Sequence, residues 1–135
     1  MSFWLVKSDP SSYSWEMFLK DKKTVWDGVR NYQARNNLAA MDIGEKVLFY
    51  HSDEGKCIVG ISQVTKKAFS DPKDKEGKWI AVEFKVVKTL KKPVTLEQIK
   101  LSNKLKDIAL IKQSRLSVIS LKEKEFDEIL NISNK

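Results

Sequence analysis

Residues 26–38 hold the densest group of side chains that could recognise a ligand. Their sequence is WDGVRNYQARNNL, in which one tryptophan, one tyrosine, two arginines, three asparagines and one glutamine accompany a glycine. Aromatic rings stack on nucleobases, guanidinium groups bind phosphates or guanine-type edges, and side-chain amides complement the Watson–Crick edges of bases. The segment therefore predicts a surface that recognises nucleic acid. The alternative is an ordinary capped helix with Trp26 in the core and solvated arginines.

Residues suited to catalysis are few. His51 is the only histidine and Cys57 the only cysteine, and the chain has no nucleophile motif, phosphate-binding glycine loop or metal-binding spacing. A His51–Cys57 pair is conceivable across a hairpin, but two such residues coincide easily by chance in a chain of this size. We therefore expect a protein that is not an enzyme and holds no metal or cofactor. A small hydrolase that uses His51 is the open alternative.

The pattern of apolar and polar residues around this segment predicts short strands mixed with short helices. Ser14 and Asn31 are predicted N-caps, and Gly60 indicates a bulge or a close approach of the backbone inside a strand. A breaker at 7–10 ends the first strand, and 70–77 resembles a linker. The predicted strands cover 3–6, 45–51, 58–64, 79–90 and 114–119, and the predicted helices cover 14–20 and 31–41 and begin again at capping-box sequences of Thr95 and Ser120.

The order of these elements predicts an α+β protein. It shows no strand–helix–strand rhythm and no repeat of about 20–50 residues. We expect a small, strongly curved, mostly antiparallel sheet or open barrel with helices at its margins. At 135 residues and 41% hydrophobic content, the chain suits a single domain over residues 1–135 that buries its own core.

The charge balance favours anionic partners. Lysine and arginine number 25 against 18 aspartates and glutamates, which gives a net charge of +7, a sign that suits nucleic acid. A lone cysteine excludes an internal disulfide and fits a reducing compartment, so we expect a cytoplasmic protein. The apolar run at 3–6 is too short for a signal peptide or a membrane span. We expect a monomer that binds nucleic acid and no membrane.

Six strings spread over nearly the whole chain share their pattern with a known family. They are WLVKSDP at 4–10, YSW at 13–15, WDGVRNYQARNNLAAM at 26–41, GEKVLFYHS at 44–52, IVGISQV at 58–64 and RLSV at 115–118. Together they resemble the EVE domain. The resemblance implies a PUA-like pseudo β-barrel, related to the YTH and ASCH folds, with about five to six strands and helices packed around the sheet.

The resemblance also implies a module that reads nucleic acid, with a modified base as its expected target and no firmly attached reaction. Carried over residue by residue, it implies base contacts from Trp4, Lys7, Ser8, Trp26, Val29, Asn31, Phe49, Tyr50, His51, Ser52, Leu116 and Ser117. It implies phosphate contacts from Arg30, Arg35, Asn36 and Arg115. We expect the base, extruded from a duplex or already single-stranded, to stack on Trp26 while Ser8 and Asn31 read its edge.

Three positions depart from the family pattern. Asp9 stands where Glu is usual, Ser120 replaces a proline that often follows RLSV, and residues 71–79 are shorter than the aromatic-bearing insertion common there. We expect little effect from Asp9 and at most a shifted helix start from Ser120. Whether the short 71–79 segment contacts nucleic acid is left open.

Several implied contacts also have a structural interpretation. Trp4 in an apolar strand fits the core, Ser8 fits a turn cap, and His51 fits a structural hydrogen bond. For the whole chain, an unspecialised RNA-binding module of the same fold is the rival interpretation.

Overall fold

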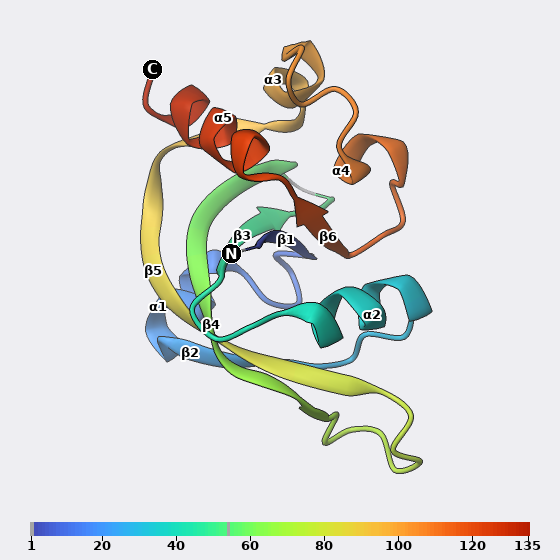
Figure 1. Ribbon diagram of the computed structural model, residues 1–135. Helices are drawn as coiled ribbons and strands as arrows, with labels where there is room; N and C mark the ends of the chain where they lie inside the picture. The colour runs from blue at the N-terminus through green and yellow to red at the C-terminus, as the bar shows by residue number, and fades with distance from the viewer. Residues whose placement is uncertain (1, 54) are drawn as a thin grey trace.

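One bent sheet of six strands organises the part of the chain that the structure describes, residues 2–53 and 55–135 (Figure 1). The structure is a computed structural model. The strands are β1 (Phe3–Ser8), β2 (Lys23–Trp26), β3 (Lys46–His51), β4 (Cys57–Ser70), β5 (Ile80–Thr95) and β6 (Val118–Leu121).

The strands lie in the order β2-β5-β4-β3-β1-β6. β1 and β3 are parallel, with Val6 beside Phe49 and Ser8 beside His51, and the other described pairs are antiparallel. The apolar runs of β1 and β3 are buried, as expected for central strands covered on both faces. The mixed sheet with its helices confirms the predicted α+β class.

The long strands β4 and β5 give the sheet its curvature. Their register shifts several times, and the largest shift lies opposite Ile58 and Gly60. A Cβ on Gly60 would lie 2.1 Å from Cζ2 of Trp15, so only glycine lets this indole lie against the strand. The Trp15 Nε1–H group donates to Thr89 Oγ1 at 2.9 Å across the same bend. The close approach predicted at Gly60 is therefore confirmed.

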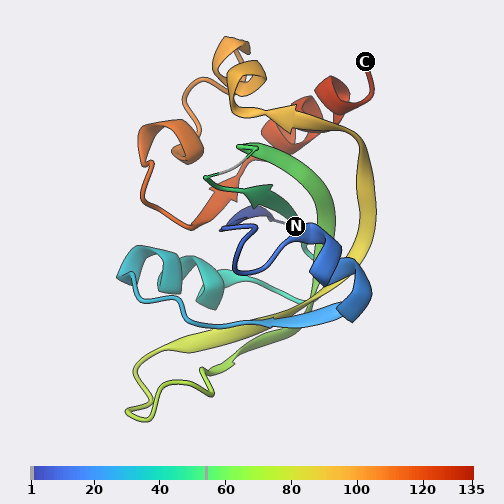
Figure 2. The same ribbon diagram turned by 180° about the vertical axis from the view of Figure 1, so that it is seen from behind.

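Five helices pack around the sheet in the described residues (Figures 1 and 2). They are α1 (Trp15–Asp21), α2 (Tyr32–Ala40), α3 (Leu96–Leu101), α4 (Ala109–Lys112) and α5 (Glu123–Ser133). α2 contacts β6 as well as β5 and β4, so it joins two distant parts of the bent sheet. α5 lies across β5 and buries Phe126 and Ile129. The helices leave the end of β1 and the segment after β2 facing each other.

The predicted caps of the first two helices are confirmed. The side chains of Ser14 and Asn31 accept backbone N–H groups at the starts of α1 and α2, and Thr95 forms the predicted capping box at the start of α3. These features are readable from sequence because capping chemistry is local.

Several predicted boundaries are wrong. β6 begins at 118 and not at 114, and β4 and β5 run to 70 and 95, beyond the predicted ends at 64 and 90. Two further errors come from strand pairing. Ser120 pairs with Trp4 inside β6, and α5 begins later, where the Glu125 carboxylate accepts the Lys122 backbone N–H at 2.8 Å. β1 does not end before Lys7 but continues through Ser8, because both residues pair with β3. In each case a long-range strand pairing overrides a local signal. Neither the short helix α4 nor the edge strand β2 was predicted.

Candidate functional site

A cavity of about 580 Å³ lies between the end of β1 and the segment that follows β2. Pockets for small molecules typically measure about 300–1,000 Å³, so the cavity has room for a planar ring system. Its lining comes from residues 7–9 at the end of β1, Ser12 and Tyr13 in the next loop, residues 24–30, Lys73 and Ser117.

The end of β1 is held on both sides. The Ser8 carbonyl accepts the Ser52 N–H at 2.9 Å, and the Lys7 N–H donates to the Ser117 carbonyl at 3.0 Å. The Ser8 hydroxyl donates to the Tyr13 carbonyl at 2.5 Å, which ties the loop after β1 to the strand. A buried central strand thus places one hydroxyl and one ammonium group at the cavity wall.

The opposite wall, residues 26–30, is anchored by Asp71. Asp71 Oδ2 accepts the Gly28 N–H at 2.8 Å and Arg30 Nη1 at 2.9 Å, and Oδ1 accepts the Lys73 N–H at 2.7 Å. Gly28 has a φ of 77°, a conformation that glycine adopts without strain. Burial alone would raise the pKa of Asp71, but the hydrogen bonds from Arg30, Gly28 and Lys73 hold it below its ordinary value.

Trp26 joins the core to the cavity. Its half-buried ring meets Tyr13 and Phe49 edge-on at centroid distances of 6.4 and 5.7 Å, and it lies 5.6 Å from Phe84. The same side chain lines the cavity. The aromatic neighbours therefore hold the ring in place while part of it remains available to a ligand.

Cations outnumber anions at the cavity. Lys7, Arg30 and Lys73 line it together with Asp9 and Asp27, and Lys73 pairs with Asp27 at 3.2 Å. The Lys7 Nζ group donates to the Ser114 carbonyl at 2.8 Å, and burial lowers its pKa. The Arg30 side chain is 40% exposed although its Asp71 partner is fully buried. Since Arg30 and Lys73 each pair with a carboxylate, these groups suit a polar ligand that carries a ring.

Tyr13 is a neutral part of the wall. Burial raises its pKa to about 12, and its hydroxyl donates to Asp21 Oδ2 at 2.8 Å. Its ring also meets Trp26. Tyr13 therefore supplies ring surface and does not act as a base at neutral pH.

The predicted site residues divide into three groups in the structure. Those that line the cavity are Lys7, Ser8, Trp26, Val29, Arg30 and Ser117. Those that line a second depression, beside the start of α2, are Asn31, Arg115 and Leu116. Those that line neither are Trp4, Phe49, Tyr50, His51, Ser52, Arg35 and Asn36.

The three aromatic residues in the last group belong to the interior, which corrects their predicted base contacts. Trp4, Phe49 and Tyr50 are at most 4% exposed. Trp4 donates from Nε1 to Glu45 Oε1 at 2.9 Å, and Phe49 packs among Trp15, Trp26 and other rings. Other side chains cover these rings almost completely, so they offer no ring surface to a base in the cavity.

His51 and Ser52 are used inside the fold. The His51 Nε2 atom accepts the Trp15 backbone N–H at 3.0 Å, and burial lowers the pKa of His51. The Ser52 N–H closes the β1–β3 ladder on Ser8. The structural interpretation of His51 thus agrees with the geometry, and its base contact stays a prediction.

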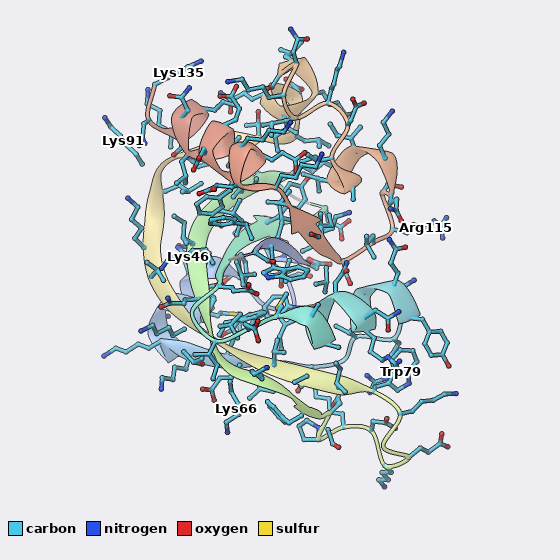
Figure 3. All side chains as sticks on the ribbon, in the orientation of Figure 1. Lys46, Lys66, Trp79, Lys91, Arg115 and Lys135 are labelled. Atoms are coloured by element: carbon cyan, nitrogen blue, oxygen red, sulfur yellow. The ribbon has the colours of Figure 1, made fainter. Side chains whose placement is uncertain are left out.

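Arg35 and Asn36 lie on a side of α2 that does not border the cavity. Arg35 donates from Nη1 to the Lys78 carbonyl at 3.1 Å, and its guanidinium carbon lies 5.5 Å from the Tyr32 ring centroid. Asn36 accepts from Arg35 Nη2 at 3.4 Å. The Trp79 ring (Figure 3) lies beside the Tyr32 ring, with centroids 5.0 Å apart and planes tilted by 32°.

Sequence reasoning missed Tyr13, Asp71 and Lys73. Asp71 lies in the segment that resembles a linker, and its burial depends on its pairing with residues 28–30, far away in the chain. No local signal reveals such a contact. Tyr13 belongs to the YSW string, so that motif could have placed it near the site.

Across residues 2–53 and 55–135, no three His, Cys, Asp or Glu side chains are grouped to hold a metal ion. No helix there is long and apolar enough to cross a membrane.

Comparison with protein families and sequences gives a consistent result. A family model described as the EVE domain matches residues 2–132. Human thymocyte nuclear protein 1 is 34% identical over 168 residues, which covers 99% of this chain and 75% of that protein.

Solved structures extend the comparison. The NMR structure of Rpa0253 from Rhodopseudomonas palustris matches with a TM-score of 0.95 and 40% identity, over 99% of this chain and 94% of that one. The human THYN1 protein in complex with DNA containing 5-methylcytosine matches with a TM-score of 0.92 and 33% identity, over 100% of this chain and 99% of that one. A YTH domain from Zygosaccharomyces rouxii matches with a TM-score of 0.60 and 16% identity, over 99% of this chain and 85% of that one. This likeness shows a shared fold alone. The predicted PUA-like fold is confirmed.

Proposed function

Because the chain belongs to the EVE domain family, we propose that its cavity receives a modified nucleobase of DNA or RNA. One observation carries the proposal. A protein that shares this fold over the whole chain, at 33% identity, binds DNA that contains 5-methylcytosine, and the present chain has a ring-sized cavity with an aromatic wall.

The base would lie against Trp26, and the hydroxyls of Ser8, Thr24 and Ser117 line the same cavity. Hydroxyl groups can both donate and accept. The Ser8 hydroxyl already donates to the Tyr13 carbonyl, so toward a base it accepts. Asn31, which was expected to read the base edge, lies in the second depression instead. Edge recognition is therefore assigned to the hydroxyls and the nearby backbone.

The energetics require contacts beyond the cavity. Extrusion of a base costs a few kcal/mol, and stacking on an aromatic ring returns about 1–3 kcal/mol. A buried methyl group adds about 0.8 kcal/mol, which is roughly fourfold in affinity. Selectivity for the modification must therefore also come from shape, and phosphate contacts must supply the rest of the affinity.

Arg30 and Lys73 are the cations at the cavity rim that can make such phosphate contacts. Both are exposed lining residues, and Asp71 holds Arg30 through one nitrogen, Nη1. An arginine carries five N–H donors, so the remaining donors can meet a phosphate.

The same geometry favours a binding module over a hydrolase. His51 Nε2 already accepts the Trp15 N–H, and burial raises the pKa of Cys57 toward an inert thiol. His51 and Cys57 do pair across the β3–β4 hairpin, but neither lines the cavity. We therefore propose a non-catalytic reader, and product formation from modified nucleotides would overturn this part of the proposal.

A panel of oligonucleotides tests the function. Each pair has one sequence, with or without a single modified base such as 5-methylcytosine, as DNA or RNA and as single or double strand. Fluorescence anisotropy should give a severalfold or greater preference for at least one modified member. Equal affinity for every pair would contradict the proposal and favour an unspecialised RNA-binding module.

A further inference from the structure

A second depression of about 310 Å³ lies where the start of α2 faces the loop between α4 and β6. Figure 3 shows Arg115 on that loop, above the N-terminal end of α2, with Trp79 on the other side of the helix end. Its lining residues are Asn31, Gln33, Lys112, Gln113, Ser114, Arg115 and Leu116, which we call the side groove.

The side groove directly adjoins the cavity. Arg30 lines the cavity and the next residue, Asn31, lines the side groove; Ser117 lines the cavity and the preceding residue, Leu116, lines the side groove. The Lys7 ammonium reaches from the cavity wall to the Ser114 carbonyl, at 2.8 Å. These consecutive residues and this hydrogen bond therefore place the two hollows next to each other.

The lining of the side groove suits a phosphate with polar groups around it. It combines two cations, three side-chain amides and one hydroxyl, and it contains no carboxylate. Lys112 pairs with Asp107 at 3.4 Å, but both side chains are more than 60% exposed, so this pair is weak. Within the described chain, no hydrogen bond or ion pair engages the Arg115 side chain, which is exposed.

We propose that the side groove binds the nucleotide next to the one whose base enters the cavity, with Arg115 on its phosphate and the amides of Gln33 and Gln113 beside its sugar and base. This inference rests on the proposed function, since it takes its ligand from the strand that delivers the base. Because the side groove lies on one side of the cavity, it holds a neighbour on either the 5′ side or the 3′ side of the bound nucleotide, but not on both.

The test uses three probes built on 5-methylcytidine: the mononucleotide and two dinucleotides that carry the extra nucleotide on the 5′ or the 3′ side. Calorimetry with the wild-type protein should show a gain in affinity for one dinucleotide and not for the other. In Arg115→Gln the gain should fall about 3–10-fold, and mononucleotide binding should stay unchanged.

A matched variant separates the groove from overall charge. Lys91→Gln removes the same single charge on the other side of the molecule (Figure 3). With a longer oligonucleotide, Arg115→Gln should reduce the slope of log affinity against log salt by about one unit, and Lys91→Gln should leave it unchanged. Equal effects of the two variants, or equal gains from both dinucleotides, would overturn the inference.

Failure of the function and failure of the groove give different results. A wild-type protein that binds unmodified and modified oligonucleotides equally contradicts the base-reading function, while the polarity of the gain and the Arg115 effect still decide the groove on unmodified probes. A wild-type protein that binds no probe contradicts both.

Discussion

The end of β3 and the end of β2 with the segment after it carry similar residues, but the fold encloses the first region and the second lines the cavity. Residues 49–52 and 26–30 both combine aromatic and polar side chains. Base contacts were expected from all of 49–52 and from Trp26 and Val29, and a phosphate contact from Arg30. β3 lies between β1 and β4, and Phe49 is fully buried there. β2 is an edge strand whose neighbour is β5, and its last residue, Trp26, lines the cavity together with the segment that follows.

The difference follows from strand position. β3 is paired along both backbone edges and Phe49 packs against other rings, whereas Trp26 is the last paired residue of the edge strand β2. The chain that leaves an edge strand loses this pairing, and here the Asp71 carboxylate satisfies the Gly28 N–H in its place. Residues 49–52 therefore support the site, and residues 26–30 form it.

The largest effect should come from the supporting region. Phe49→Ala removes a ring that is 0% exposed and packs against Trp15, Phe18 and Trp26. We expect a loss of about 3–5 kcal/mol in the free energy of unfolding, measured by urea denaturation. The control Leu19→Ala, at a side chain 40% exposed, should cost far less. If both variants lost the same free energy of unfolding, Phe49 would not be the core residue that this comparison requires.

A smaller effect should come from the anchor of the cavity wall. Asp71→Asn removes the charge from a fully buried side chain that accepts from Gly28, Arg30 and Lys73. We expect a loss of about 1.5–3 kcal/mol, because hydrogen bonds to charged groups are lost.

Asp42→Asn is the matched control for this change. Its pair with Lys67 at 2.9 Å is mostly exposed on both sides, so the loss should be below about 1 kcal/mol. If the two variants lost the same stability, Asp71 would not anchor residues 26–30.

The smallest effect concerns His51 and the pH. Burial lowers its pKa below the ordinary 6.5, so between that value and the folded pKa the unfolded chain binds more protons. The free energy of unfolding should therefore fall as the pH drops through 6.5. Unfolding between about pH 7.5 and pH 5.5 should show this loss in the wild type and less of it in His51→Gln. The pKa values of Asp71 and Glu45 lie below 3.8 and 4.5, so their contributions are lost at lower pH. If the free energy of unfolding changed equally with pH in both proteins, burial of His51 would not contribute to stability.

Sequence predicted the parts of the molecule that depend on local chemistry or on long motifs. The caps at Ser14 and Asn31 and the close approach at Gly60 follow from single residues and their neighbours. The family strings predicted the fold and brought Ser8, Trp26 and Arg30 into one site.

The same strings could not distinguish residues that line the cavity from residues that are buried beside it. Phe49 and Trp26 are both aromatic residues in strong motifs, and their burial depends on which strand lies beside them. The role of Asp71 could not be predicted for a similar reason, since a polar residue before Pro72 is typical of a loop. Its role exists only once β4 and β5 bring it to Gly28.

Trp26 provides the most direct test of the base-binding cavity. In Trp26→Ala and Trp26→Phe, thermal stability and the ratio of affinities for modified and unmodified oligonucleotides are measured on the same samples, with Trp79→Phe as the control outside the cavity. We predict that the folded Trp26 variants lose the preference for the modified base, Ala more than Phe, while salt-sensitive binding through lysine and arginine persists. A folded Trp26 variant whose affinity ratio equals that of the wild type would contradict the account.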